Sequence, residues 1–241
     1  MTRLLIVDDS DLALTLLRDA VAVQLGWSVA TAARPDDVAE ALAVQGPFDL
    51  ALVDLAYPNS HLNGLDVLLT LYEQAPQCRP VVYTQGDPSV ADMLRDAWDA
   101  FDLATALSKS RSIPSVLRDL NDAAVHGSAP VDPFLQPLLP EGRSPWRSIE
   151  GYGRLVGHAG HAKLWRALIE LDQEPSYRDL AEHTGLSLPS VRNYRGELLD
   201  DLALHYLDRP RMRQMQLFAK RCRPLLEPHI RRKLDVTGTP M

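Results

Sequence analysis

The sequence predicts an α/β fold, a doubly wound parallel five-stranded sheet, followed by an all-α domain. Two observations carry this prediction. Up to Val125, short apolar runs alternate with stretches of helical period, which is the pattern of a parallel sheet with helices on both faces. After a proline-rich segment, only helical patterns follow to the end of the 241-residue chain.

Five apolar runs have the length and the bounds of buried strands, and they cover residues 3–7, 28–32, 50–53, 80–83 and 104–108. The helix expected after the first run carries apolar residues at i, i+4 spacing on the side that we expect to face the sheet: Leu12, Leu16, Ala20 and Val23. A last helix over 114–125 closes the domain. Five βα units of this length match a flavodoxin-like fold, in which ligands bind outside the carboxyl ends of the strands.

The predicted domain organisation has three parts. Residues 1–126 form the first domain, 127–146 a linker, and 147–241 a helical domain that ends in a basic helix. The linker contains five prolines and no periodic apolar face, and proline at this density favours an extended, semi-rigid spacer. These prolines are Pro130, Pro133, Pro137, Pro140 and Pro145.

Charge is divided unevenly along the chain, whose net charge is -7. Residues 1–142 carry 8 Lys and Arg against 20 Asp and Glu, a net charge of -12, whereas residues 143–241 carry 17 against 12, a net charge of +5. Opposite signs are expected where one domain handles a cation or a phosphoryl group and the other faces a polyanion.

Membrane spans and secretion are not indicated. No apolar run approaches the roughly 20 residues that a spanning helix needs, and two acids follow the first four apolar residues too early for a signal peptide. We therefore expect a cytoplasmic protein without a membrane partner. Cys78 and Cys222 have no disulfide or zinc spacing, and the histidines lack metal-ligand spacing with Cys or acids, so capping or surface roles are expected for them.

The residues that carry chemistry in the first domain follow four of the predicted strands. Asp8 and Asp9 follow the first strand, Asp54 the third, Thr84 the fourth and Lys109 the fifth. Three carboxylates in one crevice repel one another unless a hard cation neutralises them, and Mg2+ is the usual cation. A metal-bound carboxylate can attack a phosphoryl group, while a lysine and a hydroxyl meet the new oxygens. The sequence thus predicts a Mg2+ cofactor and Asp54 as the nucleophile.

These residues resemble the receiver domain of bacterial response regulators in two-component systems. The matching motifs are Leu4-Leu5-Ile6-Val7-Asp8-Asp9-Ser10, Val53-Asp54-Leu55 with Pro58, Asn63-Gly64-Leu65, Thr84 and Lys109. The resemblance implies that a histidine kinase phosphorylates Asp54. It also implies that Asp9, Asp54 and the backbone carbonyl of Ala56 hold Mg2+, and that Asp8 helps through water.

The match has departures in the parts that read out phosphorylation. Gly64 comes two residues later than in the family, and Ser110 replaces a common proline. The position of the family's aromatic switch residue is Ala106, so Phe101 or Tyr83 would have to supply a substitute ring. An atypical receiver regulated without phosphorylation therefore stays open as an alternative.

The stretch 176–198 has the signals of a helix-turn-helix. Ser176 and Asp179 form a predicted capping box, Gly185 ends the first helix, and Ser187 caps the second. This pattern resembles the helix-turn-helix of bacterial regulators, and the second helix is similar to the recognition helix of the LuxR/NarL type. Four side chains are expected to point outward, toward phosphates and base edges of a DNA partner: Ser190, Arg192, Asn193 and Arg195.

A basic stretch over 209–233 follows, whereas LuxR/NarL domains ordinarily end soon after the recognition helix. Three roles are open for this basic stretch: a solvent-exposed charged face, a set of contacts to DNA phosphates, or a dimerisation helix. We expect a homodimeric, DNA-binding response regulator that controls transcription and is not an enzyme. A sigma-like module that contacts RNA polymerase is the second class, and a phosphoryl hydrolase is disfavoured because Ala56 stands where a proton-donating acid would be needed.

Overall fold

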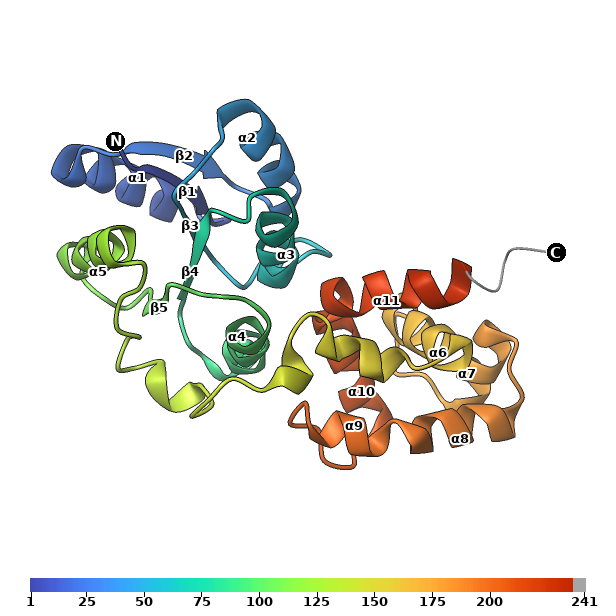
Figure 1. Ribbon diagram of the computed structural model, residues 1–241. Coiled ribbons are helices and arrows are strands. Elements are labelled where there is room, and N and C mark those ends of the chain that lie inside the picture. Colours follow the sequence, from blue (N-terminus) through green and yellow to red (C-terminus); the bar gives the residue numbers. More distant parts are fainter. Residues whose placement is uncertain (236–241) are drawn as a thin grey trace. The chain divides into compact units, whose positions relative to one another are not determined.

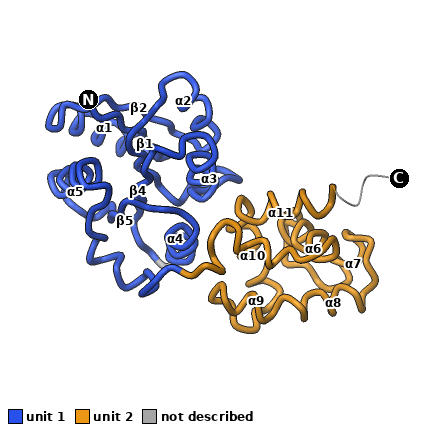
Figure 2. The backbone as a smooth tube through the Cα atoms, viewed as in Figure 1, with its two compact units in different colours: residues 1–143 blue, residues 144–241 orange. Residues whose placement is uncertain are grey.

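The computed structural model describes residues 1–235, except for the side chains of Pro88 and Ser89. The chain forms two compact units, residues 1–143 and 144–241 (Figure 2). The predicted helical domain runs to residue 241, and its last part, 236–241, lies outside the described residues. Among the described residues, no helix is long and apolar enough to cross a membrane.

The first unit is built on a parallel five-stranded sheet of order β2-β1-β3-β4-β5 (Figure 1). Its strands are β1 (Arg3–Val7), β2 (Ser28–Ala32), β3 (Leu50–Val53), β4 (Arg79–Thr84) and β5 (Thr105–Ser108). Its helices are α1 (Asp11–Leu25), α2 (Val38–Gln45), α3 (Gly64–Gln74), α4 (Pro88–Ala100) and α5 (Ile113–His126), with short 3-10 turns η1 (Pro35–Asp37) and η2 (Gln136–Leu138). The predicted fold class is confirmed.

The core of this unit lies where α1 and α5 pack on one face of the sheet. Leu14, Leu17 and Val21 of α1 are buried against sheet residues such as Leu4 and Leu50. The predicted contact side of α1 is confirmed for Ala20, which packs against this core, but wrong for Leu12 and Val23, which are 69% and 84% exposed. The helix is apolar on most of its circumference, so spacing alone does not decide which side the sheet covers.

The proline-rich segment is not a spacer over its first part. Ala129 N–H donates to the Ala104 carbonyl over 3.1 Å, and Asp132 N–H donates to the Ala106 carbonyl over 2.9 Å. The prolines lack an N–H, but the residues between them keep theirs, and edge strand β5 offers free carbonyls. The first unit consequently extends to Arg143 rather than ending near residue 126.

The second unit is helical throughout its described part, as predicted. It contains 3-10 turns η3 (Pro145–Arg147) and η4 (Gly151–Val156) and helices α6 (Ala159–Glu170), α7 (Tyr177–Thr184), α8 (Leu188–Glu197), α9 (Leu199–Ala203), α10 (Met212–Arg221) and α11 (Arg223–Asp235). Its core contains Tyr152, Trp165 and Phe218, all fully buried. The indole N–H of Trp165 donates to the Leu155 carbonyl, so the one polar group of this ring is satisfied.

The segment 176–198 forms the two capped helices and the intervening turn that the sequence predicts. Ser176 and Asp179 form a reciprocal capping box at the start of α7. Gly185 takes the left-handed conformation with φ 67°, which only glycine adopts without strain, and it ends α7. Ser187 then caps α8 by accepting the Ser190 N–H, and buried Val191 faces the core.

Candidate functional site

The parallel register of the sheet brings the predicted acids together. Val7 of β1 pairs with Val53 of β3, so Asp8 and Asp54 leave the sheet side by side. A carboxylate oxygen from each of Asp8, Asp9 and Asp54 lies within 4.8 Å of the others. Asp8 and Asp54 are buried and Asp9 is exposed, so the cluster opens to solvent on one side.

Lys109 lies between the two buried acids. Its Nζ is 2.8 Å from Asp54 Oδ2 and 2.7 Å from Asp8 Oδ2. The backbone holds it there, because Lys109 N–H donates to the Thr84 carbonyl over 2.8 Å. Thr84 is buried at the end of β4. Asp8, Asp9, Asp54, Thr84 and Lys109 therefore meet at the carboxyl edge of the sheet.

The charges in this site are strongly coupled. Burial raises the pKa of the Asp54 carboxyl, and the hydrogen bond from Lys109 works against that shift. Burial alone would lower the pKa of Lys109, but hydrogen bonds and charge attraction from Asp54 and Asp8 raise it above its ordinary value. The ammonium group thus stays charged beside the carboxylates.

The residues present fit a hard cation. All the side-chain donors are carboxylate oxygens, the ligands that Mg2+ prefers. Asp8 Oδ1 accepts the Ser10 N–H and Asp54 Oδ1 accepts the Leu55 N–H, which leaves the second oxygen of each acid directed at the shared crevice. Asp8 Oδ2 is buried and contacts the Lys109 ammonium at 2.7 Å, so this oxygen already faces a positive charge in the crevice where a cation would bind. Ala56 is half-buried in the loop after β3.

The long loop after Asp54 is closed by Gly64. Gly64 N–H donates to the Leu55 carbonyl over 3.0 Å, and a Cβ on Gly64 would lie only 2.5 Å from the Asp54 carbonyl oxygen. Tyr57 in this loop is buried, and its hydroxyl donates to the Val7 carbonyl over 3.0 Å. Burial and the acids of the site raise the pKa of Tyr57. Sequence reasoning missed this residue, although it stands three positions after Asp54.

Of the two rings proposed as substitutes for the switch residue, Tyr83 lies beside Lys109 and Phe101 lies elsewhere. Ala106 is buried without a ring at that position, and the Tyr83 ring centroid lies 5.8 Å from Lys109 Nζ. Phe101 lines a separate cavity with Leu71 and Cys78. The Ser110 hydroxyl forms a local hydrogen bond with the Ser108 hydroxyl, 2.7 Å away.

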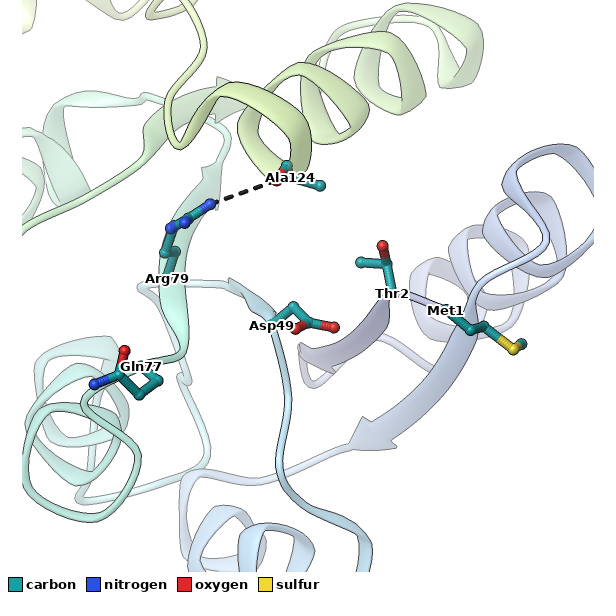
Figure 3. Close-up of a pocket in the computed structure, with 6 residues that line it drawn as sticks. All are labelled: Met1, Thr2, Asp49, Gln77, Arg79 and Ala124. Atoms are coloured by element: carbon teal, nitrogen blue, oxygen red, sulfur yellow. Dashed lines mark hydrogen bonds between the residues drawn. The ribbon is translucent and has the colours of Figure 1, made fainter.

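A cavity of about 250 Å³ lies at the opposite, amino edge of the sheet, and the described residues of its lining contain no cluster of acids like that formed by Asp8, Asp9 and Asp54. It is lined by Met1, Thr2, Asp49, Gln77, Arg79 and Ala124 (Figure 3). Arg79 extends to the carbonyls of Ala123 and Ala124 at the end of α5. A guanidinium at the carboxyl end of a helix satisfies free carbonyls, so Arg79 has a structural role here.

The four residues predicted to face DNA do not all point outward. Arg192 and Asn193 are exposed on α8, and Ser190 is half-buried with its hydroxyl 2.8 Å from that of Ser187. The prediction for Arg195 is wrong in orientation, because its guanidinium donates to the Pro210 carbonyl over 2.5 Å and its Nε is buried. The chain after α8 returns beneath Arg195, which sequence spacing did not reveal.

Sequence reasoning also missed a cluster at the end of α8. Nε2 of His158 and Nε2 of His161 lie 3.2 Å and 3.0 Å from Glu197 Oε2. The spacing allows a metal, but His158 Nδ1 accepts the Gly160 N–H, so the proton of a neutral ring sits on Nε2, where a metal would need the lone pair. These contacts are therefore hydrogen bonds. Burial, with His158 close by, lowers the pKa of His161.

The basic stretch closes the core of the second unit. Met215 and Phe218 of α10, Leu226 of α11 and Cys222 between the two helices are buried, and α11 packs on α6. The apolar side of the stretch is thus used within its own unit and is not free for a dimerisation helix. Basic residues on the other side, among them Arg213, Arg231 and Arg232, are exposed.

Residues 4–112, slightly less than half of the chain, match the family model of the response regulator receiver domain. A search of curated proteins finds no match. A receiver domain protein from Methanospirillum hungatei is 20% identical over 52% of this chain and 95% of its own, with a TM-score of 0.44. TrrA from Thermotoga maritima, solved in complex with Mg2+-BeF, is 20% identical over 51% of this chain and 98% of its own, with a TM-score of 0.42.

Some of the similar structures cover most of this chain. The response regulator RcsB of Salmonella typhimurium, described for conformational dynamism in DNA interaction, is 14% identical over 90% of this chain and 98% of its own, with a TM-score of 0.48. The family match, together with the acids and the lysine at the strand ends, supports a response regulator whose receiver domain is the first unit.

Proposed function

We propose that this protein is a DNA-binding response regulator. A histidine kinase phosphorylates Asp54 in the first unit, and the second unit binds DNA through α8 to control transcription. The observation that carries the proposal is the convergence of Asp54, Asp8 and Lys109 at the carboxyl edge of a sheet whose residues match the receiver family.

The geometry supports a simple phosphoryl transfer. Asp54 Oδ2 attacks the phosphorus of a phosphohistidine, a P–O bond forms, the P–N bond breaks, and the imidazole of the kinase leaves with the electron pair and takes a proton. Lys109 Nζ, already 2.8 Å from Asp54 Oδ2, pairs with a new phosphoryl oxygen. Mg2+, when bound, adds the positive charge that offsets the acids and the phosphoryl oxygens. No acid stands at Ala56 to protonate a leaving group, which favours a phosphoacceptor over an enzyme that turns over a phosphomonoester.

The second unit offers the features that a DNA-binding helix requires. α8 is capped at Ser187 and presents Arg192 and Asn193 to solvent. Arginine and asparagine are suited to base edges in the major groove, and the exposed arginines of α10 and α11 are suited to phosphates. The net charge of +5 over 143–241 favours a polyanionic partner.

Phosphorylation by acetyl phosphate with Mg2+ tests the first half of this proposal. We expect one phosphoryl group per chain by intact mass, base-labile as an acyl phosphate is, and absent from Asp54→Asn. Asp36→Asn, an exposed acid in the same unit, is the matched control and should be labelled like the parent. Labelling of Asp54→Asn at the parental level would place the acceptor elsewhere.

A further inference from the structure

The segment 128–143, which we name the return segment, runs back along the outer edge of the sheet. Its N–H groups at Ala129 and Asp132 donate to the carbonyls of Ala104 and Ala106, and the Thr105 hydroxyl donates to the Pro130 carbonyl over 2.9 Å. The free edge of β5 is therefore paired with this chain's own proline-rich segment instead of standing open.

Asp132 anchors the return segment beside the acceptor site. The residue is 3% exposed, and its carboxylate accepts the N–H of Phe134 over 2.8 Å and the N–H of Ser108 over 3.3 Å. Its Oδ2 also lies 3.4 Å from Nε of Arg111. Ser108 directly precedes Lys109, so the N–H that Asp132 accepts belongs to the residue next in sequence to the lysine that contacts Asp54.

The return segment also contacts the loop that follows Thr84. Gly86 in this loop has φ 74° and lies against the side chain of Leu135, and a Cβ on Gly86 would be 3.1 Å from the ring of Phe134. Leu135 is fully buried. A movement of Thr84 toward a phosphoryl group on Asp54 would shift this loop and remove the surface on which Leu135 packs.

Two further contacts hold the segment on α4. Arg95 Nε donates to the Leu138 carbonyl over 3.0 Å. Arg143 Nη1 lies 2.9 Å from Asp102 Oδ1. The guanidinium of Arg143 also lies over the Trp98 ring, 5.4 Å from the ring centroid. These arginine contacts are partly exposed, so each is weak beside the buried anchor at Asp132.

We propose that the return segment is the conformational readout of the first unit: its anchor at Asp132 is released from β5 when Asp54 is phosphorylated. The inference rests on the proposed phosphorylation of Asp54. A phosphoryl group adds negative charge and strong acceptors that draw in Lys109 and Thr84. Both neighbours of the anchor, Ser108 on β5 and the loop at Gly86, are tied to those two residues. The carbonyl of Ala106, the residue at the position of the missing switch ring, accepts the N–H of Asp132 over 2.9 Å.

Hydrogen exchange of the full-length protein tests the proposal. We expect peptides over 129–139 to exchange about tenfold faster after acetyl phosphate and Mg2+ than before, because their N–H groups lose the β5 carbonyls. In Asp132→Ala these peptides should exchange fast in both states. Glu141→Ala, an exposed acid of the same segment, is the matched control and should behave like the parent. Arg95→Gln should speed exchange only near Leu138, which separates loss of one contact from unfolding of the unit.

Intact mass on the same samples separates failure of the inference from failure of the function. Full labelling of Asp54 with unchanged hydrogen exchange over 129–139 contradicts the proposed release of the return segment and leaves the proposed role of Asp54 as phosphoacceptor intact. Absence of labelling overturns both. Slow exchange in unlabelled Asp132→Ala overturns the anchor itself, whatever the labelling shows.

Discussion

Lys109 Nζ and Asp54 Oδ2 lie 2.8 Å apart, so the lysine offsets the charge of this buried acid. Asp8 Oδ2 is as close to the same ammonium group. Lys109 and a bound cation would therefore act alike at this edge of the sheet, because either one offsets the negative charge of the buried carboxylates.

Lys109→Met should therefore destabilise the first unit by about 3 kcal/mol in EDTA, since two buried carboxylates lose their partner. Mg2+ should recover part of that loss and should stabilise the variant more than it stabilises the parent. Urea unfolding with EDTA and with Mg2+ measures both effects. Equal stabilisation of both proteins by Mg2+ would mean that lysine and cation act independently.

Asp9→Ala should abolish Mg2+ binding, because the exposed carboxylate of the cluster is the one open to an entering cation. Isothermal titration with Mg2+ provides the measurement. Asp11→Ala, in the first turn of α1, removes the same charge nearby and should bind Mg2+ nearly as the parent does. Parental affinity in Asp9→Ala would contradict the assigned site.

Gly64→Ala should cost about 2–3 kcal/mol and impair labelling of Asp54, because the new methyl group meets the backbone of Asp54 and Leu55. The close approach is to backbone atoms, so no side-chain movement relieves it. Gly142→Ala is the matched control, since no atom lies within 4 Å of a Cβ there. Chemical denaturation and labelling by intact mass are the two measurements.

The second unit should lose stability as the pH falls below about 6.5, the pKa of an unfolded histidine. Burial, with a smaller effect of Arg147, lowers the pKa of His205 to about 4, and its ring contacts Tyr152 and Phe218. The folded histidine stays neutral while the unfolded one takes up a proton, so stability is fully present above pH 6.5 and is lost down to about pH 4. Between pH 7 and 5 the loss is about 2 kcal/mol.

Urea unfolding of the full-length protein at several pH values measures this loss of stability, with hydrogen exchange of peptides from α6 and α10 as the readout for the second unit. His205→Phe should flatten the pH dependence, whereas His183→Gln, on the surface of α7, should leave it nearly unchanged. An equally steep decline in His205→Phe would assign the dependence to other groups, of which His161 is the nearest candidate.

Asn193→Ala should reduce affinity for an operator selected from random sequences by roughly 1–3 kcal/mol and affinity for random duplex much less, since a lost base contact relaxes specificity. Arg213→Ala, on the exposed side of α10, should weaken both complexes alike and lower the salt slope by about one. Gel shift or anisotropy titrations at several salt concentrations measure both. Equal losses for Asn193→Ala would favour the RNA polymerase-contacting alternative.

The parts of the structure that follow from local sequence were predictable. The bounds of the first three strands are as predicted, whereas those of β4 differ by one residue at each end and that of β5 by one residue at its start. The acids and the lysine at the strand ends and the caps at Ser176, Gly185 and Ser187 appear where the sequence places them. In a parallel sheet, residues that follow neighbouring strands must meet at one edge, so Asp8 and Asp54 could be brought together without knowledge of the packing.

Other features depended on partners far along the chain, and only the tertiary structure decided them. The side of α1 that packs on the sheet, the inward turn of Arg195 toward Pro210, and the pairing of Glu197 with His158 and His161 are set by such partners. The same holds for the return segment, whose prolines alone indicate a spacer. Its pairing with β5 follows only from the position of that strand at the edge of the sheet. Local patterns fix backbone conformation, whereas burial and pairing depend on which surface the rest of the chain supplies.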